Sequence, residues 1–163
     1  MHNTLQKWLA RDPDAKSRDE LQALIDGDNQ DELSRRFSSR LEFGTAGLRG
    51  VVGAGPAMMN RLVIRETSAG LGAYVLREVA DAASRGIIVA YDGRTDSRQF
   101  AEDAACVFAA LGITVYLTPA VAATPLAAFG VVNLGAAAAV VVTASHNPPQ
   151  YNGYKVYWEM VRK

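Results

Sequence analysis

The chain has 163 residues, enough for one domain with a sizeable buried core. Its 17 basic and 17 acidic side chains balance, and nothing in them points to a nucleic-acid patch or a polybasic membrane surface. The longest near-apolar stretch, residues 135–144, is too short to cross a bilayer, and we see no secretory signal. A single cysteine, Cys106, excludes an intrachain disulfide, so we expect a cytoplasmic protein with Cys106 buried in a helix.

Residues 4–37 are polar and predict an arm of two or three helices. Breaks are expected at Asp12-Pro13 and at residues 27–29, which contain a glycine. The apolar side chains of this arm that we expect to be buried are Leu21, Leu24, Ile25 and Leu33. Because the composition changes at Leu41, the sequence predicts an N-terminal helical arm at 1–40 and a second unit at 41–163.

The second unit begins with a glycine-rich loop at residues 43–50. Asn60 is expected to cap a helix running to about residue 84, Ser97 to cap a second helix, and Thr124-Pro125 to open a third. Short apolar runs predict strands at 87–91, 113–117, 136–143 and 154–158. The alternation predicts a three-layer α/β domain with a mostly parallel sheet of about four strands, the last of them antiparallel.

The strand predicted at 136–143 delivers Ser145, His146 and Asn147 to one edge of the sheet. In open α/β sheets, ligands bind at the carboxyl ends of the strands. Ser145 lacks the Gly-x-Ser-x-Gly turn of α/β-hydrolases. Successive side chains of an extended chain point to opposite faces, so His146 is poorly placed as a simple base for Ser145.

Phosphoryl transfer suits this segment better. A serine can carry a phosphoryl group if cations and backbone donors offset its charge of about −1.5 to −2. Pro148-Pro149 stiffens the chain, and Asn152-Gly153 predicts a hairpin turn that brings Lys155 near Ser145. A lysine there can clamp a phosphate as a point charge or, if desolvated, act as a general acid or base.

The motif Thr-Ala-Ser-His-Asn-Pro at 143–148, followed by Asn-Gly-x-Lys at 152–155, resembles the phosphoserine loop of the α-D-phosphohexomutase superfamily. This superfamily includes the phosphoglucomutases and phosphomannomutases. Further landmarks of the family occur upstream in the same order: residues 43–50, Asp92-Gly93-Arg94 and Thr124-Pro125. The resemblance covers residues 38–158 and implies the first of the family's four domains.

The resemblance implies a sugar phosphomutase that interconverts hexose 1-phosphate and 6-phosphate through phosphorylated Ser145 and a bisphosphate intermediate. It implies Mg²⁺ held in part by the phosphate on Ser145, and a sugar 1,6-bisphosphate as the phosphorylating activator. The implied catalytic residues are Ser145, Lys155, Arg49 and His146. The implied contacts to sugar phosphate are Thr45, Gly47, Arg49, Asn147 and Arg94, although Arg94 can equally brace the loop after its strand.

The family's Asp-rich loop, with three carboxylate ligands for Mg²⁺, has no counterpart in the sequence, nor do its later sugar- and phosphate-binding loops. We therefore expect a domain fragment that folds but lacks full mutase turnover. A phosphopentomutase or sugar-bisphosphate synthase domain is an alternative. A second is a non-catalytic module that binds sugar phosphate, or docks to the missing domains or to itself through an exposed interface. Gly53-x-Gly55 suggests a dinucleotide site, but Pro56 interrupts the required helix start.

Overall fold

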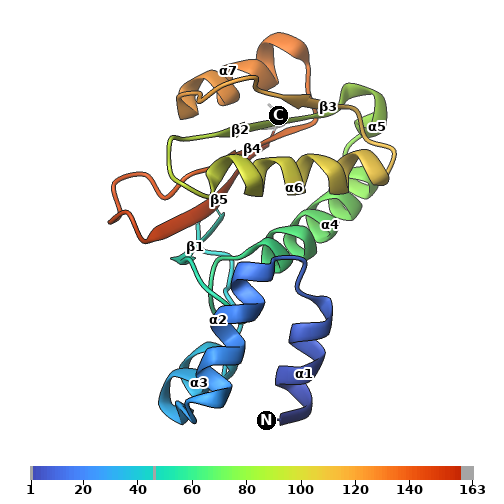
Figure 1. Ribbon diagram of the computed structural model, residues 1–163. Helices are drawn as coiled ribbons and strands as arrows, with labels where there is room; N and C mark the ends of the chain where they lie inside the picture. The colour runs from blue at the N-terminus through green and yellow to red at the C-terminus, as the bar shows by residue number, and fades with distance from the viewer. Residues whose placement is uncertain (1, 46, 159–163) are drawn as a thin grey trace.

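Three short helices at the N-terminus precede a sheet that carries helices on both faces (Figure 1). The computed structural model describes residues 2–45 and 47–158. Ala46 of the predicted glycine-rich loop and residues 159–163 of the predicted second unit lie outside the described residues.

The predicted arm consists of three helices, α1 (His2–Arg11), α2 (Ala15–Asp26) and α3 (Gln30–Phe37). Asp14 and Asn29 cap α2 and α3, because their side chains accept hydrogen bonds from backbone N–H groups of the first turn. Leu21 and Leu33 are buried as predicted, and they join the same apolar cluster as residues of the sheet. Arg36 also links the arm to the next segment, since its guanidinium donates to the carbonyl oxygen of Ala54.

The sheet has five strands in the order β1-β5-β4-β2-β3. The strands are β1 (Gly47–Val51), β2 (Ile87–Tyr91), β3 (Val115–Leu117), β4 (Ala138–Val142) and β5 (Tyr151–Trp158). β2 pairs in parallel with β3 and β4, and β5 is antiparallel to β4, which confirms the predicted parallel set with an antiparallel last strand. β1 was predicted as loop, and its pairing with β5 raises the number of strands to five.

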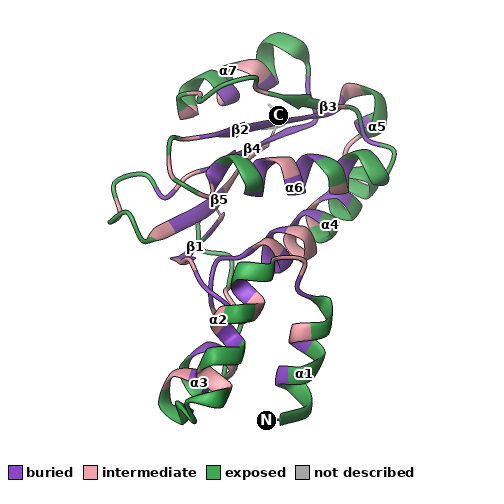
Figure 2. Cartoon of the chain, viewed as in Figure 1, coloured by how far each residue is buried: buried purple, intermediate pink, exposed green. Residues whose placement is uncertain are grey.

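Four helices complete the layers: α4 (Arg61–Glu78), α5 (Ala82–Arg85), α6 (Ser97–Ala110) and α7 (Thr124–Leu134). Alternate strand residues face opposite layers, as the period of a strand requires. Val89 and Val140 join the cluster that includes residues of α4 and α6, whereas Ile88 and Val141 join the cluster with α7. The central strands are therefore buried on both faces (Figure 2), and the predicted three-layer α/β architecture is confirmed.

Three local expectations were wrong. The single helix predicted from Asn60 to about residue 84 is divided into α4 and α5, because Val79 adopts an extended conformation. Asp96 occupies the N-cap position of α6, while the hydroxyl of Ser97 donates to Asp92 instead of capping the helix. Cys106, expected to be buried, is exposed.

The Gly53–Gly55 segment does not form a dinucleotide-binding turn. The side-chain amide of Asn60 donates to the carbonyl oxygens of both glycines, and the segment packs against Arg36 of the arm. Among the described residues, no helix is both long and apolar enough to cross a membrane.

Candidate active site

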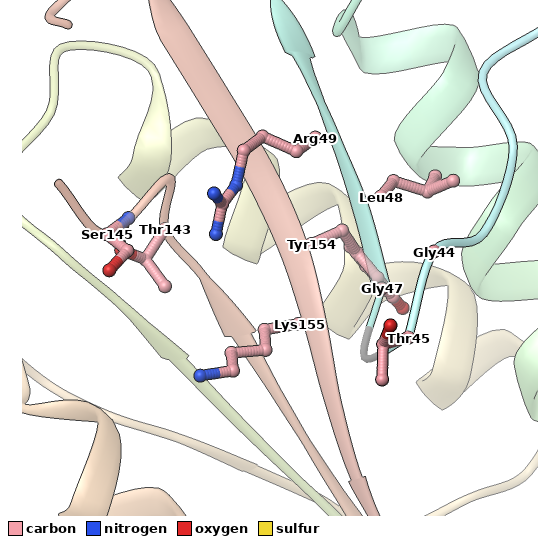
Figure 3. A pocket seen from close by; sticks show the side chains of 9 residues that line it. All are labelled: Gly44, Thr45, Gly47, Leu48, Arg49, Thr143, Ser145, Tyr154 and Lys155. Carbon is pink, nitrogen blue, oxygen red and sulfur yellow. Dashed lines mark hydrogen bonds between the residues drawn. The ribbon is translucent and has the colours of Figure 1, made fainter. Parts of the chain in front are cut away.

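Polar segments follow the carboxyl ends of two parallel neighbours, β2 and β4. The segment after β4 meets side chains from β1 and β5 around a cavity of about 460 Å³ (Figure 3), while the segment after β2 lines a neighbouring cavity. The cavity is lined by Gly44, Thr45, Gly47, Leu48, Arg49, Thr143, Ser145, Tyr154 and Lys155. The structure therefore gathers five of the predicted site residues in one place: Thr45, Gly47, Arg49, Ser145 and Lys155.

The pairing of β1 with β5 places both cations on the cavity side of the sheet. Gly47 lies opposite Lys155 and Arg49 lies opposite Gly153, so these four residues share one face. The intervening pair, Leu48 and Tyr154, is buried. Figure 3 shows the side chains of Arg49 and Lys155 reaching toward Ser145 from the two neighbouring strands.

The predicted hairpin turn at Asn152-Gly153 was wrong. Both residues belong to β5, where they pair with Gly50 and Arg49 of β1. The chain reverses earlier, where the N–H of Asn147 donates to Ala144 and the N–H of Tyr151 donates to Pro148. Lys155 thus reaches the cavity through strand pairing.

Two glycines allow the strands to approach closely at the cavity. A Cβ atom on Gly153 would lie 2.5 Å from the carbonyl oxygen of Thr143 and 2.8 Å from that of Leu48. A Cβ atom on Gly47 would lie 1.9 Å from the carbonyl oxygen of Tyr154, and Gly47 has a φ of +146° that side chains disfavour. Gly47 was predicted in a loop and Gly153 in a turn, but both glycines instead allow neighbouring backbone segments to pack closely.

Ser145 has a left-handed backbone conformation, with a φ of +58°. For a residue with a side chain this conformation costs about 1–2 kcal/mol, so the surrounding structure has to impose it. The backbone N–H of Ser145 donates to the hydroxyl of Thr143 at 2.9 Å, and its carbonyl oxygen accepts from Arg94 at 3.0 Å. The hydroxyl of Ser145 remains exposed toward the cavity.

Arg94 braces this loop from the other side. Its guanidinium, with five N–H groups, donates to the carboxylate of Asp92 and to the carbonyl oxygens of Ser145, Asn147, Pro148 and Tyr151. The donor–acceptor distances lie between 2.8 and 3.1 Å. Of the two roles predicted for Arg94, this geometry favours the brace, and its contact with sugar phosphate stays a prediction.

The carboxylate of Asp92 accepts a hydrogen bond from Arg94 and so helps to hold the Arg94 side chain in place. Burial raises the pKa of its carboxyl group, but hydrogen bonds from Ser97 and Thr143, the N–H of Arg94 and the Arg94 charge outweigh that effect, so the pKa is lowered. The Ser97 hydroxyl donates to Asp92 at 2.6 Å and accepts from Asn152 at 3.0 Å. No role in the site was predicted for Ser97 or for the side chain of Asn152, although Asn152 belongs to the motif at 152–155. A further signal for both is that buried polar groups need partners.

His146 and Asn147 differ in how firmly they are placed. The Nδ1 atom of His146 lies 3.4 Å from the hydroxyl oxygen of Ser145, which is long for a hydrogen bond, and both residues are exposed. The side-chain oxygen of Asn147 accepts a 2.9 Å hydrogen bond from Arg49. Asn147 lines a second cavity beside the first, together with Asp92 and Arg94.

Within residues 2–45 and 47–158, no group of three or more His, Cys, Asp or Glu side chains could hold a metal ion. Mg²⁺ requires near-octahedral oxygen coordination. The nearby carboxylate of Asp92 is already occupied by Ser97 and Arg94. The described residues alone therefore do not fit a magnesium centre, and the ligand predicted through a phosphate on Ser145 stays a prediction.

This chain is similar to known phosphomutases and to one of their family models. Residues 40–161 match the family model described as phosphoglucomutase/phosphomannomutase, alpha/beta/alpha domain I. Phosphopentomutase of Mus musculus is 40% identical over 94% of this chain and 26% of its own length. Glucose 1,6-bisphosphate synthase of Mus musculus is 36% identical over 98% of this chain and 27% of its own length.

The fold of this chain is also similar to solved structures of the phosphoglucomutase/phosphomannomutase family. The crystal structure of a phosphoglucomutase/phosphomannomutase family protein from Burkholderia thailandensis superposes with a TM-score of 0.60 and 28% identity. The match covers 71% of this chain and 25% of that one. The chain thus spans about a quarter of the length of the relatives it matches.

Proposed function

The chain belongs to the phosphoglucomutase/phosphomannomutase family, and on that premise we propose that it is the phosphoserine domain of a sugar phosphomutase. The observation that carries the proposal is the convergence of Arg49 and Lys155 on the exposed hydroxyl of Ser145. Transfer of a phosphoryl group depends mostly on positioning and on stabilisation of negative charge. Arg49 and Lys155, on adjacent strands, stabilise negative charge. The left-handed backbone of Ser145, which the surrounding structure holds in place, positions the hydroxyl group.

In the proposed half-reaction, the hydroxyl oxygen of Ser145 attacks a phosphorus atom of a sugar bisphosphate. The new bond joins Ser145 to phosphorus, the bond from phosphorus to the sugar oxygen breaks, and the serine proton passes in net to that sugar oxygen. Lys155 donates to the departing oxygen, while Arg49 acts as a fixed charge because guanidinium does not deprotonate in proteins. The reverse reaction returns the phosphoryl group to either end of a sugar monophosphate.

The leading substrate is a hexose phosphate, with a sugar 1,6-bisphosphate as the phosphorylating activator. A pentose phosphate is the second candidate. It is supported by the 40% identity of this chain with a protein named phosphopentomutase. Mg²⁺ is proposed to bind an oxygen of the Ser145 phosphate, and no step above depends on it. We also propose a cytoplasmic location, with which the single cysteine is compatible.

The proposed partners are the other domains of a phosphomutase, since the relatives are about four times as long as this chain. Helix α7 has no charged residue and offers an apolar surface for them. Its exposed apolar side chains are Leu126, Phe129, Val132 and Leu134. We expect the isolated chain to self-associate through this surface in sedimentation experiments. A Val132→Lys variant should reduce that association, and a strictly monomeric wild-type chain would contradict the proposal.

Mass spectrometry tests the function directly. The chain is incubated with glucose 1,6-bisphosphate or ribose 1,5-bisphosphate and Mg²⁺, and the intact mass and peptides are measured. We expect one phosphate on Ser145 and none on a Ser145→Ala variant, and the faster donor indicates the sugar class. Absence of label, or label on another residue, would overturn the assignment of Ser145. Mutase turnover by this chain, absent in Ser145→Ala, would contradict the expectation that it is incomplete.

A further inference from the structure

Several carbonyl groups of the loop after β4 face Arg94. Within the described residues, four carbonyl oxygens accept from this one guanidinium: those of the loop residues Ser145, Asn147 and Pro148 and that of Tyr151, the first residue of β5. Arg94 is only 16% exposed and is itself held by Asp92. The orientation of the loop's peptide planes is therefore fixed from inside the fold.

Fixing a carbonyl group also fixes the N–H group of the same peptide unit. In a trans peptide the two point in opposite directions, and the described chain has no cis peptide bond. Residues 148 and 149 are prolines without N–H groups, and Asn152 belongs to β5. In the loop, the donor whose direction Arg94 sets is thus the backbone N–H of His146, which follows the carbonyl group of Ser145.

This N–H group is available to a ligand. Among the hydrogen bonds of the described chain, none uses the backbone N–H of His146. Ser145 lines the cavity that contains Arg49 and Lys155, whereas Arg94 lines the neighbouring cavity. Because the carbonyl group of Ser145 faces Arg94, the N–H of His146 points away from Arg94. The N–H groups on either side are already used, by the hydroxyl of Thr143 and by the carbonyl oxygen of Ala144, so His146 supplies the free donor of this turn.

We propose that the backbone N–H of His146 donates a hydrogen bond to the phosphoryl group on Ser145, and that Arg94 is the positioning residue that aims it. The inference rests on the proposed function, because it assigns a donor to the phosphorylated state of the same serine. It gives His146 a role through its main chain, in addition to the side-chain role predicted for it. Backbone donors aimed at a phosphoryl group add to the charges of Arg49 and Lys155 without reorganisation during transfer.

The test uses the chain with phosphoserine incorporated at position 145 during synthesis, labelled with ¹⁵N. We expect the amide proton of His146 to move downfield relative to the unphosphorylated chain. This shift should titrate with the phosphate, near its second pKa of about 6. A His146→Ala variant retains the N–H and should retain the shift. An amide proton at position 146 that does not respond to phosphorylation or to its titration would overturn the proposal.

Variants of Arg94 test the positioning role. Arg94→Lys keeps the charge but has at most three donors, so we expect the downfield shift to be lost. Arg94→Ala should lose it as well, and millimolar guanidinium should restore it. The control is Arg98→Ala, because Arg98 is exposed on α6 and pairs only with Glu102 in the described structure. A full shift in Arg94→Lys would overturn the assignment of Arg94.

Labelling kinetics separate this inference from the function on which it rests. In Arg94→Lys we expect the rate of Ser145 phosphorylation by glucose 1,6-bisphosphate to fall about 100-fold, as for a small misplacement of a reacting group. If Arg94→Ala does not fold, Arg94→Lys and the wild-type phosphate titration still decide the outcome. Because phosphoserine is introduced during synthesis, failure of the donor to label the wild type overturns only the proposed function.

Discussion

Arg49 donates a 2.9 Å hydrogen bond to the side-chain oxygen of Asn147, although the two residues lie 98 positions apart in the sequence. The bond joins β1 to the loop that carries Ser145. It fixes a cation at the rim of the cavity by means of a neutral partner, so the positive charge of Arg49 remains available to a phosphoryl group.

Replacing Asn147 by alanine should slow phosphorylation of Ser145 about fivefold, because the loss of one hydrogen bond of about 1 kcal/mol frees the Arg49 side chain to move. The contact is exposed, so the free energy of unfolding should change by less than about 0.5 kcal/mol. The rate is followed by intact mass. Asn133→Ala, an exposed change on α7, serves as the control. A rate in Asn147→Ala equal to that of the wild type would show that this contact has no role.

Gly153→Ala should lower the free energy of unfolding by about 2–3 kcal/mol, measured by urea denaturation. The added methyl group would meet the carbonyl oxygens of Thr143 and Leu48, which belong to the backbone and cannot rotate away. The matched control is Gly70→Ala within α4, where a Cβ atom meets nothing within 4 Å. That change should be neutral or stabilising by up to about 1 kcal/mol. Equal effects of the two substitutions would contradict the close approach of the strands.

Tyr154 and Ser68 share a buried 2.9 Å hydrogen bond beneath the cavity. Tyr154→Phe leaves the Ser68 hydroxyl without this partner and should cost about 1–3 kcal/mol of unfolding free energy. Adding Ser68→Ala should recover part of the loss, since both polar groups are then removed. A double-mutant cycle measures the coupling. Additive effects of the two changes would indicate that the bond contributes nothing.

The same tyrosine predicts loss of stability at alkaline pH. Burial raises the pKa of Tyr154 above its ordinary value, and the hydrogen bond with Ser68 only partly offsets this. Its contribution to stability is fully present below the unfolded pKa of about 10 and is lost as the pH rises toward the folded value. Tyr154→Phe should therefore flatten the alkaline limb of the unfolding free energy. If the unfolding free energy of that variant still falls at alkaline pH as in the wild type, groups other than Tyr154 cause the loss.

Asp92 predicts the opposite dependence at acid pH. Its folded pKa is lowered, so its contribution to stability is present above the unfolded pKa of 3.8 and is lost as the pH falls through the folded value. Asp92→Asn should weaken the acid-dependent loss of unfolding free energy below about pH 4. Asp19→Asn, at an exposed position on α2, is the control. If the two variants show the same acid limb, the network around Arg94 does not depend on an ionised Asp92.

Local signals in the sequence were sufficient for most elements. Pro13 and Gly27 do separate three helices, Asn60 does cap α4, and Pro125 does lie in the first turn of α7. Each of these signals acts within a few residues, by removing an N–H donor, by permitting a turn or by capping a helix. The buried strand before Thr143 was also predictable, because it reads as an unbroken apolar run.

The site itself depends on contacts between distant segments, which local patterns do not specify. Asn152-Gly153 has the composition of a turn, yet Gly153 lies in a strand and pairs with Arg49 of β1. The position requires glycine because the carbonyl oxygens of Leu48 and Thr143 come too close for a side chain. The role of Arg94 follows from the shape of a loop that lies more than fifty residues further along the chain. Such relationships become visible only when the strands are paired.

The position of β5 between β1 and β4 sets the order in which the site can be assembled during synthesis. A nascent chain that ends at Gln150 already contains Arg49, Arg94 and Ser145 but lacks Lys155 and the strand that separates β1 from β4. β1 can complete its pairing only after β5 has left the ribosome, and this pairing joins Gly47 to Lys155, so it has a high contact order and is intrinsically slow. Until then the cavity lacks Lys155, so the newly made serine should be a poor phosphoryl acceptor on the ribosome.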